Sequence, residues 1–231
     1  MIFFDPTYMI FMLPALLLMI IAQSYVSSAY RKWSQVIAQS RLTGAIAAQR
    51  LISAGGLDVS INGVHGKLTD NYDPRRKVLN LSEGVFNSPS VAALAITAHE
   101  LGHAMQDREG YFPLKLRAAM VPAVNIGSYL GWILIFIGMI FRQTNLSWLG
   151  VLVFSGGALF ALATLPVEFN ASARAKQLLT DTGMIVGEDE RRGVNNVLNA
   201  AALTYIAGLF AAVMQLLYFV SLVGGMGGRR R

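Results

Sequence analysis

Residues 90–106 read SVAALAITAHELGHAMQ and hold the pattern His99-Glu100-x-x-His103 within a run of small, helix-favouring residues. On a helix, positions i and i+4 lie one turn apart on one face, so both imidazoles can reach one ion while Glu100 points to its open side. We expect this helix to begin at Ser88-Pro89, with the serine as N-cap. The alternative is that these three side chains have no functional role on the helix. Burying them without a partner such as a metal, however, is energetically costly.

The composition indicates a membrane protein. Of 231 residues, 54% are hydrophobic and 14% are charged, and the mean hydropathy is +0.49, which is too apolar for an ordinary soluble enzyme. The chain has no cysteine, so zinc would have to be held by histidine and carboxylate. The net charge of +6 indicates contact with anionic lipid headgroups and not with nucleic acid, because no basic run is interleaved with aromatic residues.

Four apolar segments are long enough to cross a lipid bilayer, which takes about 20 helical residues. They cover residues 8–30, 118–141, 147–165 and 200–223, and the middle two form a helical hairpin. A signal peptide is the alternative for the first segment, but the residues before it carry Asp5 instead of basic side chains and the apolar run is too long. We therefore expect a mainly α-helical integral membrane protein with about four transmembrane helices.

A small α+β domain of the zincin type is expected between the first span and the hairpin. An amphipathic helix over Trp33–Ala54 ends at Gly55-Gly56, and alternating residues between positions 57 and 81 predict two short strands joined by a loop, with a turn at Asn71–Pro74. The predicted division of the chain is residues 1–30 (first span), 31–117 (most of the metal-binding domain), 118–165 (hairpin), 166–199 (a further helix and a polar segment) and 200–231 (last span, with a flexible basic tail from Gly224).

The distribution of lysine and arginine predicts the orientation in the membrane. Fifteen of them lie in residues 31–117 and 166–199, against four at Arg142 and in the tail, so the positive-inside rule places the metal-binding domain in the cytoplasm. Four spans then put the Arg229–Arg231 tail outside, against the rule. Either the last segment does not cross fully or the tail is tolerated there.

A catalytic zinc site takes three protein ligands and leaves a position open for water. A third histidine on the same segment is disfavoured. The pattern His-Glu-x-x-His-x-x-Gly-x-x-His would need glycine and histidine at the positions where this chain has Gln106 and Glu109. Glu168 is the better candidate, since the hairpin returns it to the side of the motif and completes a His₂Glu set. Asp107 is the local rival, with a supporting hydrogen bond as its other role, and His65 is a weaker one that also suits an ordinary loop position.

Four motifs give the chain a resemblance to a known family. They are Gly66–Pro74, Val78–Ser82, His99–Gln106 and Leu165–Ser172. In this order, and over nearly the whole length, the chain resembles the YugP-type bacterial membrane neutral zinc metallopeptidases, which are distantly related to the HtpX-like gluzincins. The resemblance implies a bacterial inner-membrane zinc peptidase with His99, His103 and Glu168 as ligands of Zn²⁺.

Ser172 and Arg174, which both follow Glu168 in the sequence, are relevant to the expected site. In the wider gluzincin pattern the third ligand is followed four residues later by an aspartate that supports a ligating histidine, whereas Ser172 stands there in this chain. Arg174 lies on the same segment and could stabilise a tetrahedral oxyanion as a catalytic group. The alternative for Arg174 is a place in the headgroup region.

The first functional hypothesis is an endopeptidase that cuts membrane or membrane-proximal proteins. Zinc would lower the pKa of a bound water to about 7, and Glu100 would take the water's proton and pass it to the leaving amine. The second hypothesis is a membrane scaffold or regulatory protein in which zinc only stabilises the fold, which a closed four-ligand site would favour. A channel or transporter is disfavoured because no predicted span carries a buried ionisable residue.

Overall fold

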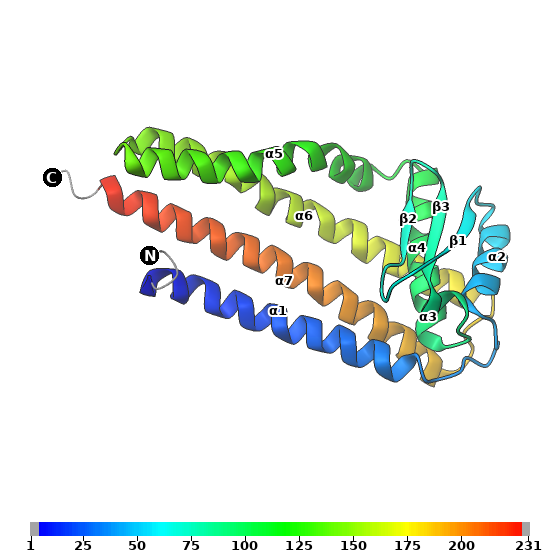
Figure 1. Ribbon diagram of the computed structural model, residues 1–231. Coiled ribbons are helices and arrows are strands. Elements are labelled where there is room, and N and C mark those ends of the chain that lie inside the picture. The colour runs from blue at the N-terminus through cyan, green and yellow to red at the C-terminus, as the bar shows by residue number, and fades with distance from the viewer. Residues whose placement is uncertain (1–4, 228–231) are drawn as a thin grey trace. The chain divides into compact units, whose positions relative to one another are not determined.

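The computed structural model describes residues 5–227, which form seven helices and three strands (Figure 1). The elements are α1 (Pro6–Trp33), α2 (Gly44–Gly55), β1 (Ser60–Val64), β2 (Asn71–Asp73), β3 (Val78–Ser82), α3 (Glu83–Phe86), α4 (Val91–Arg108), α5 (Phe112–Ile140), α6 (Thr144–Asp181) and α7 (Glu188–Gly227). They divide into two compact units: a span unit within residues 1–22, 115–165 and 204–231, and a site unit of residues 23–114 and 166–203. Helices α1, α5, α6 and α7 contribute residues to both.

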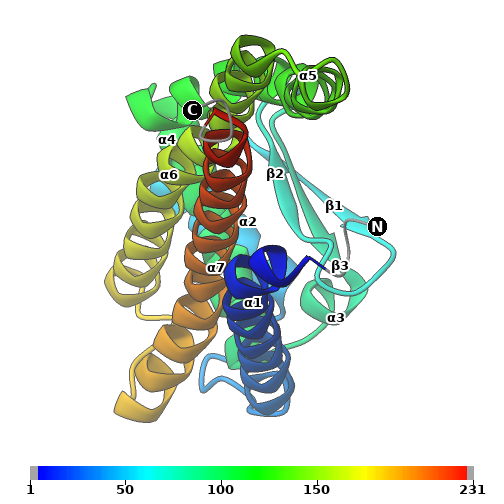
Figure 2. The same ribbon diagram turned by 90° about the vertical axis from the view of Figure 1, so that its left-hand side faces the viewer.

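The prediction of four helices long enough to cross a membrane is confirmed. Helices α1, α5, α6 and α7 have 28, 29, 38 and 40 residues, and each contains an apolar stretch of the required length. Within the span unit α1 and α7 lie side by side (Figure 2), and the rings of Tyr8 and Tyr218 pack edge to face with their centroids 5.0 Å apart. An aromatic contact of this kind stabilises the packing of the first span against the last one.

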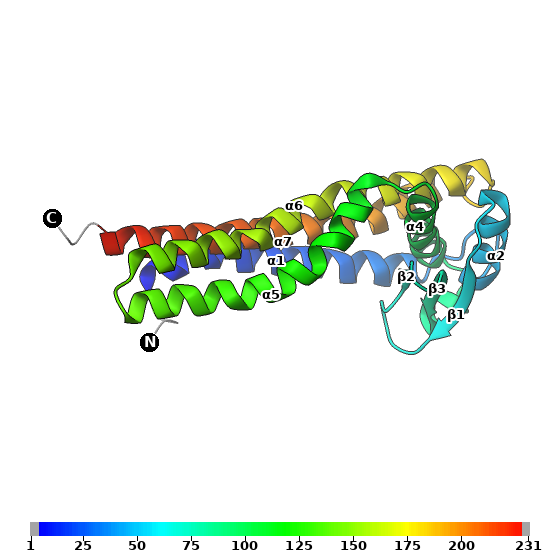
Figure 3. The same ribbon diagram turned by 90° about the horizontal axis from the view of Figure 1, so that it is seen from above.

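The hairpin of α5 and α6 is packed backbone to backbone. A Cβ placed on Gly131 of α5 would lie 3.0 Å from the carbonyl oxygen of Gly150 of α6, so both positions need a residue without a side chain. Figure 3 shows α5 changing direction along its length, as expected for a helix that contains Pro122. This close contact fixes the two predicted middle spans against each other.

The site unit contains a three-stranded sheet with the order β1-β3-β2. Strand β1 runs parallel to β3, whereas β2 is antiparallel to β3 with Tyr72 opposite Leu79. The two predicted strands are present as β1 and β3, but the turn predicted at Asn71–Pro74 was wrong, because residues 71–73 pair with β3 as a third strand and the turn follows at residues 74–77. The extra strand is an edge of the sheet and lies beside α4 (Figure 1).

The predicted start of the metal-binding helix was two residues early. Ser90, and not Ser88, is the N-cap of α4, and its Oγ accepts a hydrogen bond of 3.2 Å from the backbone N–H of Ala93. The carbonyl oxygen of Pro89 instead accepts a backbone hydrogen bond from Ala38 in the loop before α2, and that of Ser88 accepts one from Gly44 at the start of α2. Contacts with a distant loop therefore displaced the helix boundary.

The amphipathic helix predicted over Trp33–Ala54 was also wrong in part. Helix α1 continues to Trp33, residues 34–43 form turns and a short bridge between Ile37 and Ser90, and α2 begins only after its N-cap Thr43. The predicted end was closer, since α2 stops at Gly55 and Gly56 adopts the left-handed conformation with φ of 59°. The bridge to Ser90 fixes the segment that periodicity alone assigned to a helix.

Helices α6 and α7 are longer than the sequence predicted. Helix α6 passes through Pro166 without ending, so the third span and the helix after it are one element. Helix α7 begins at Glu188, within the polar stretch at residues 181–199 that was expected to precede the last span, because Val194 and Leu198 on one face belong to the core of the site unit. At its other end α7 continues through Gly227, where a flexible tail was expected from Gly224, and the predicted Arg229–Arg231 tail lies outside the described residues.

Candidate metal centre

Helix α4 carries the histidine pair and is buried along most of its length. Its apolar residues belong to the main core of the site unit, together with Leu51 of α2 and with Leu79 and Leu81 of β3. A helix held on several sides has little freedom to rotate or shift. Its packing therefore gives His99 and His103, one helical turn apart, fixed positions.

Helix α6 approaches α4 at Gly102, which lies between the two histidines in the sequence. A Cβ at this position would lie 2.5 Å from the carbonyl oxygen of Ala171, a distance that no real Cβ can adopt. The third residue before Ala171 on α6 is Glu168, so the contact brings its carboxylate towards the two imidazoles. Gly102 thus allows the two helices that carry the candidate ligands to come into contact.

His99, His103 and Glu168 form a candidate metal-binding group. One possible ligand atom from each lies within 4.8 Å of the others, and the side chain of Glu168 is only 2% exposed. Oε2 of Glu168 is 3.3 Å from Nε2 of His99 and 3.6 Å from Nε2 of His103. Tetrahedral ligands at about 2.1 Å from zinc are about 3.4 Å apart, so the spacing and the donor set of two nitrogens and one oxygen both fit a zinc ion.

The second ring nitrogen of each histidine also has a partner. Nδ1 of His99 lies 3.2 Å from Oγ of Ser172, and Nδ1 of His103 lies 3.0 Å from Oε1 of Gln106. Partners at Nδ1 orient an imidazole and leave Nε2 for the metal. The serine that departs from the gluzincin pattern therefore contacts a histidine from the position where that pattern has an aspartate.

Glu100 lies beside the two histidines on α4 and is held by the edge strand. Its Oε2 accepts a hydrogen bond of 3.0 Å from the backbone N–H of Tyr72 in β2. Burial raises the pKa of the Glu100 carboxyl, against an opposing effect of His99 and His103. A carboxylate with a raised pKa accepts protons more readily, as a general base must.

The electrostatic balance at His103 is different. Burial lowers the pKa of the His103 imidazole, but the nearby carboxylates of Glu168 and Glu100 outweigh this effect, and the net pKa is raised. The negative charge of the two glutamates thus favours positive charge between them. A divalent cation would supply this positive charge.

The two rival ligands are engaged elsewhere. Asp107 accepts a hydrogen bond of 2.9 Å from the hydroxyl of Tyr72, and His65 pairs at 2.7 Å with Glu83 on the surface, where its side chain is 96% exposed. Among the described residues, neither belongs to the candidate group, and no fourth His, Asp or Glu joins it. The group therefore offers three possible protein ligands, the number expected of an open site.

Comparison with known proteins agrees with this donor set. Residues 8–224 match the family described as "Putative neutral zinc metallopeptidase". The chain belongs to this family. A relative from Bacillus subtilis (strain 168), named "Putative membrane protease YugP", is 46% identical over 200 residues, which cover 86% of this chain and 88% of the relative. No solved structure matches the chain.

Membership of the zinc metallopeptidase family confirms the resemblance seen in the sequence and supports zinc as the ion of the candidate centre. The match spans all four long apolar helices and the site unit. The protein is thus a membrane-associated member of a zinc peptidase family. The roles of its individual side chains follow from geometry and are proposals.

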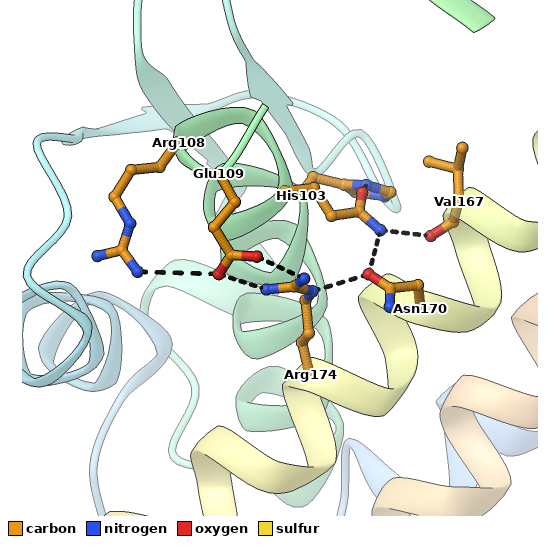
Figure 4. Close-up of polar contacts among 7 residues, drawn as sticks. His103, Arg108, Glu109, Val167, Asn170 and Arg174 are labelled. Carbon is orange, nitrogen blue, oxygen red and sulfur yellow. Dashed lines mark hydrogen bonds and ion pairs between the residues drawn. The ribbon is translucent and has the colours of Figure 1, made fainter. Parts of the chain in front are cut away.

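Arg174, which the sequence suggested as an oxyanion-binding group, forms a two-point ion pair with Glu109. Its two terminal nitrogens each donate to an oxygen of Glu109 at 2.7 Å, and its Nε donates to Oδ1 of Asn170 at 2.7 Å (Figure 4). All three nitrogens of the guanidinium therefore have acceptors within the protein. Its oxyanion role stays a prediction.

Sequence reasoning missed Gln106, although the residue lies in the quoted motif stretch. Its side chain is 0% exposed, and it contacts His103 on its own helix and Val167 and Asn170 on α6. A glutamine three residues after a ligating histidine shares a helical face with it, which was a usable signal.

Proposed function

We propose that the protein is a zinc-dependent endopeptidase of the gluzincin type. The observation that supports this most strongly is the group of His99, His103 and Glu168, with Glu100 beside the two histidines on the same helix. A zinc ion held by these three side chains would polarise a peptide carbonyl and lower the pKa of water to about 7. Three ligands with an open position favour catalysis over the scaffold role, for which a closed site would be expected.

Glu100 is the proposed general base. It takes the proton of the water that attacks the peptide carbonyl, and it later gives this proton to the leaving amine. Its raised pKa and its fixed position support both transfers. The hydrogen bond from the N–H of Tyr72 holds one carboxylate oxygen and leaves the other for the proton.

The edge strand β2 is the proposed binding surface for an extended peptide. It has β3 on one side only, and the backbone N–H of its central residue, Tyr72, reaches the catalytic Glu100. An unpaired strand edge can bind a peptide by main-chain hydrogen bonds. A peptide placed along this edge would lie next to Glu100.

The proposed substrates are membrane proteins or their juxtamembrane segments, and the proposed location is the cytoplasmic side of the bacterial inner membrane. Four apolar helices keep the enzyme in a lipid bilayer. The excess of lysine and arginine in residues 31–117 and 166–199 favours the cytoplasm for the site. The named relative is described as a membrane protease, which supports a substrate of protein nature.

The test compares wild-type protein with Glu100→Gln in two settings. In purified form, the variant should keep its zinc but lose cleavage of a protein substrate by a factor of about 100 or more. In cells, uncleaved precursors should accumulate in the membrane proteome of the Glu100→Gln strain. Glu83→Gln, which changes an exposed glutamate in the same unit, serves as the matched control. Full proteolysis by zinc-loaded Glu100→Gln protein would show that the mechanism is wrong.

A further inference from the structure

A chain of hydrogen bonds connects the ligand His103 to a permanent charge on α6. Oε1 of Gln106 faces Nδ1 of His103 at 3.0 Å, and Nε2 of Gln106 donates to Oδ1 of Asn170 at 2.9 Å. The same oxygen of Asn170 accepts from Nε of Arg174 at 2.7 Å, and Arg174 is in turn paired with Glu109 (Figure 4). The series of hydrogen bonds thus begins on α4, passes through α6 and ends at Glu109, the C-cap of α4.

The direction of each hydrogen bond in this series is fixed by which groups can donate and which can only accept. Arg174 carries donors and no acceptor, so Asn170 must present its oxygen and not its amide nitrogen. Nε2 of Gln106 also donates to the carbonyl oxygen of Val167 at 2.8 Å, and a carbonyl can only accept. The amide nitrogen of Gln106 therefore faces α6, and its oxygen faces His103.

The orientation of Gln106 decides which nitrogen of His103 carries the proton. Because Oε1 of Gln106 can only accept, Nδ1 of His103 must be the N–H donor. The lone pair then lies at Nε2, the atom that faces Glu168 at 3.6 Å. A neutral imidazole with its lone pair on this side is the form that binds a metal.

We propose that Gln106 and Asn170 are positioning residues that hold His103 in its metal-binding tautomer and join α4 to α6 next to Glu168. This inference deepens the proposed function and rests on it, since it assigns supporting groups to the same zinc centre. Gln106 contacts the carbonyl of Val167, the residue directly before Glu168, so one amide orients two ligands. Neither residue needs to touch the substrate.

The first experiment measures zinc affinity of the purified, full-length protein by competition with a chelator. Gln106→Met keeps the length of the side chain but removes its donor and acceptor, and we expect zinc binding to weaken by about 10- to 100-fold, as is typical for loss of a supporting group. Gln177→Met, the same change at an exposed position of α6, is the control and should bind zinc as the wild type does. Equal affinity of Gln106→Met and wild type would overturn the proposal.

A pair of variants at Asn170 separates the hydrogen-bond direction from simple packing. Asn170→Asp keeps an oxygen for both donors, whereas Asn170→Leu has a similar volume and no acceptor. We expect Asn170→Asp to retain zinc affinity within about threefold and Asn170→Leu to lose about tenfold or more. Asn170 is only partly buried, so both variants should fold even if Gln106→Met does not. Equal zinc affinity in the two variants would contradict the assigned direction.

The tautomer itself can be read by nitrogen NMR of the metal-free protein, because the chain has only three histidines. At a pH where the imidazoles are neutral, His103 should have its proton on Nδ1 in the wild type, and this preference should be lost in Gln106→Met. A wild-type proton on Nε2 would refute the proposal. Because neither this measurement nor zinc affinity needs a substrate, a protein that binds zinc but cuts nothing would refute the proposed function alone.

Discussion

Gly102 of α4 lies directly against the backbone of Ala171 of α6, so closely that a Cβ on Gly102 would come within 2.5 Å of the Ala171 carbonyl oxygen. The contact lies between the two histidines on one helix and one turn beyond Glu168 on the other. It is therefore the place where a small change in helix spacing acts most directly on the candidate metal centre.

Gly102→Ala should damage zinc binding without touching any ligand. The added methyl group forces α6 away from α4, and overpacking of this kind typically costs about 1–3 kcal/mol of stability. We expect weaker zinc binding in a chelator competition and a lower melting temperature. The control is Gly208→Ala in α7, where an added Cβ would meet nothing within 4 Å. Wild-type zinc affinity in Gly102→Ala would mean that this contact does not set the position of Glu168.

Asp107→Asn should leave zinc binding intact. The carboxylate of Asp107 accepts from the hydroxyl of Tyr72 at 2.9 Å, and an amide oxygen can accept the same bond. The expected result is a wild-type zinc content by metal analysis, with a change in stability of about 1 kcal/mol or less from the loss of a charged acceptor. Loss of zinc from this variant would indicate that Asp107 is a zinc ligand.

Ser172→Ala should weaken zinc binding through His99. The serine hydroxyl lies 3.2 Å from Nδ1 of His99, and its removal frees the ring to rotate. We expect the dissociation constant for zinc to rise by about tenfold. Ser155→Ala, which removes a hydroxyl that donates to the carbonyl oxygen of Leu152 in the same helix, is the matched control. If both variants bind zinc equally well, the serine does not support the site.

Arg174→Gln distinguishes two roles for the same side chain. If Arg174 anchors the hydrogen-bond chain to His103, the variant should bind zinc several-fold more weakly, and Glu109→Gln should have a smaller effect in the same direction. Zinc titration and steady-state kinetics on the same preparations separate the cases. Unchanged zinc affinity with a large fall in kcat would instead support the predicted oxyanion role.

The parts of the fold that follow local patterns could be predicted from the sequence. Apolar length predicted the four long helices, and the spacing of His99, Glu100 and His103 predicted a helix with two ligand side chains on one face. Glu168 could be proposed because the hairpin between residues 118 and 165 must return the chain to the side from which it left. These inferences need only periodicity and connectivity.

The features that sequence reasoning missed all depend on contacts between distant segments. Strand β2 was predicted as a turn because its three residues acquire strand geometry only by pairing with β3. The loop at residues 34–43 is held by a bridge to Ser90. The bond from Gln106 to Asn170 joins residues 64 positions apart, and no local pattern reports such a pair.

The most direct test of the zinc centre compares Glu168→Gln with Glu100→Gln by measuring zinc per protein molecule after purification and dialysis against a weak chelator. Both changes remove one negative charge and keep the side-chain shape, so they differ only in the role of the residue. If Glu168 is the third ligand and Glu100 the base, Glu168→Gln should lose its zinc, whereas Glu100→Gln should retain about one zinc ion per chain, as expected for a single site. Retention of zinc by Glu168→Gln, or its loss from Glu100→Gln alone, would contradict the account.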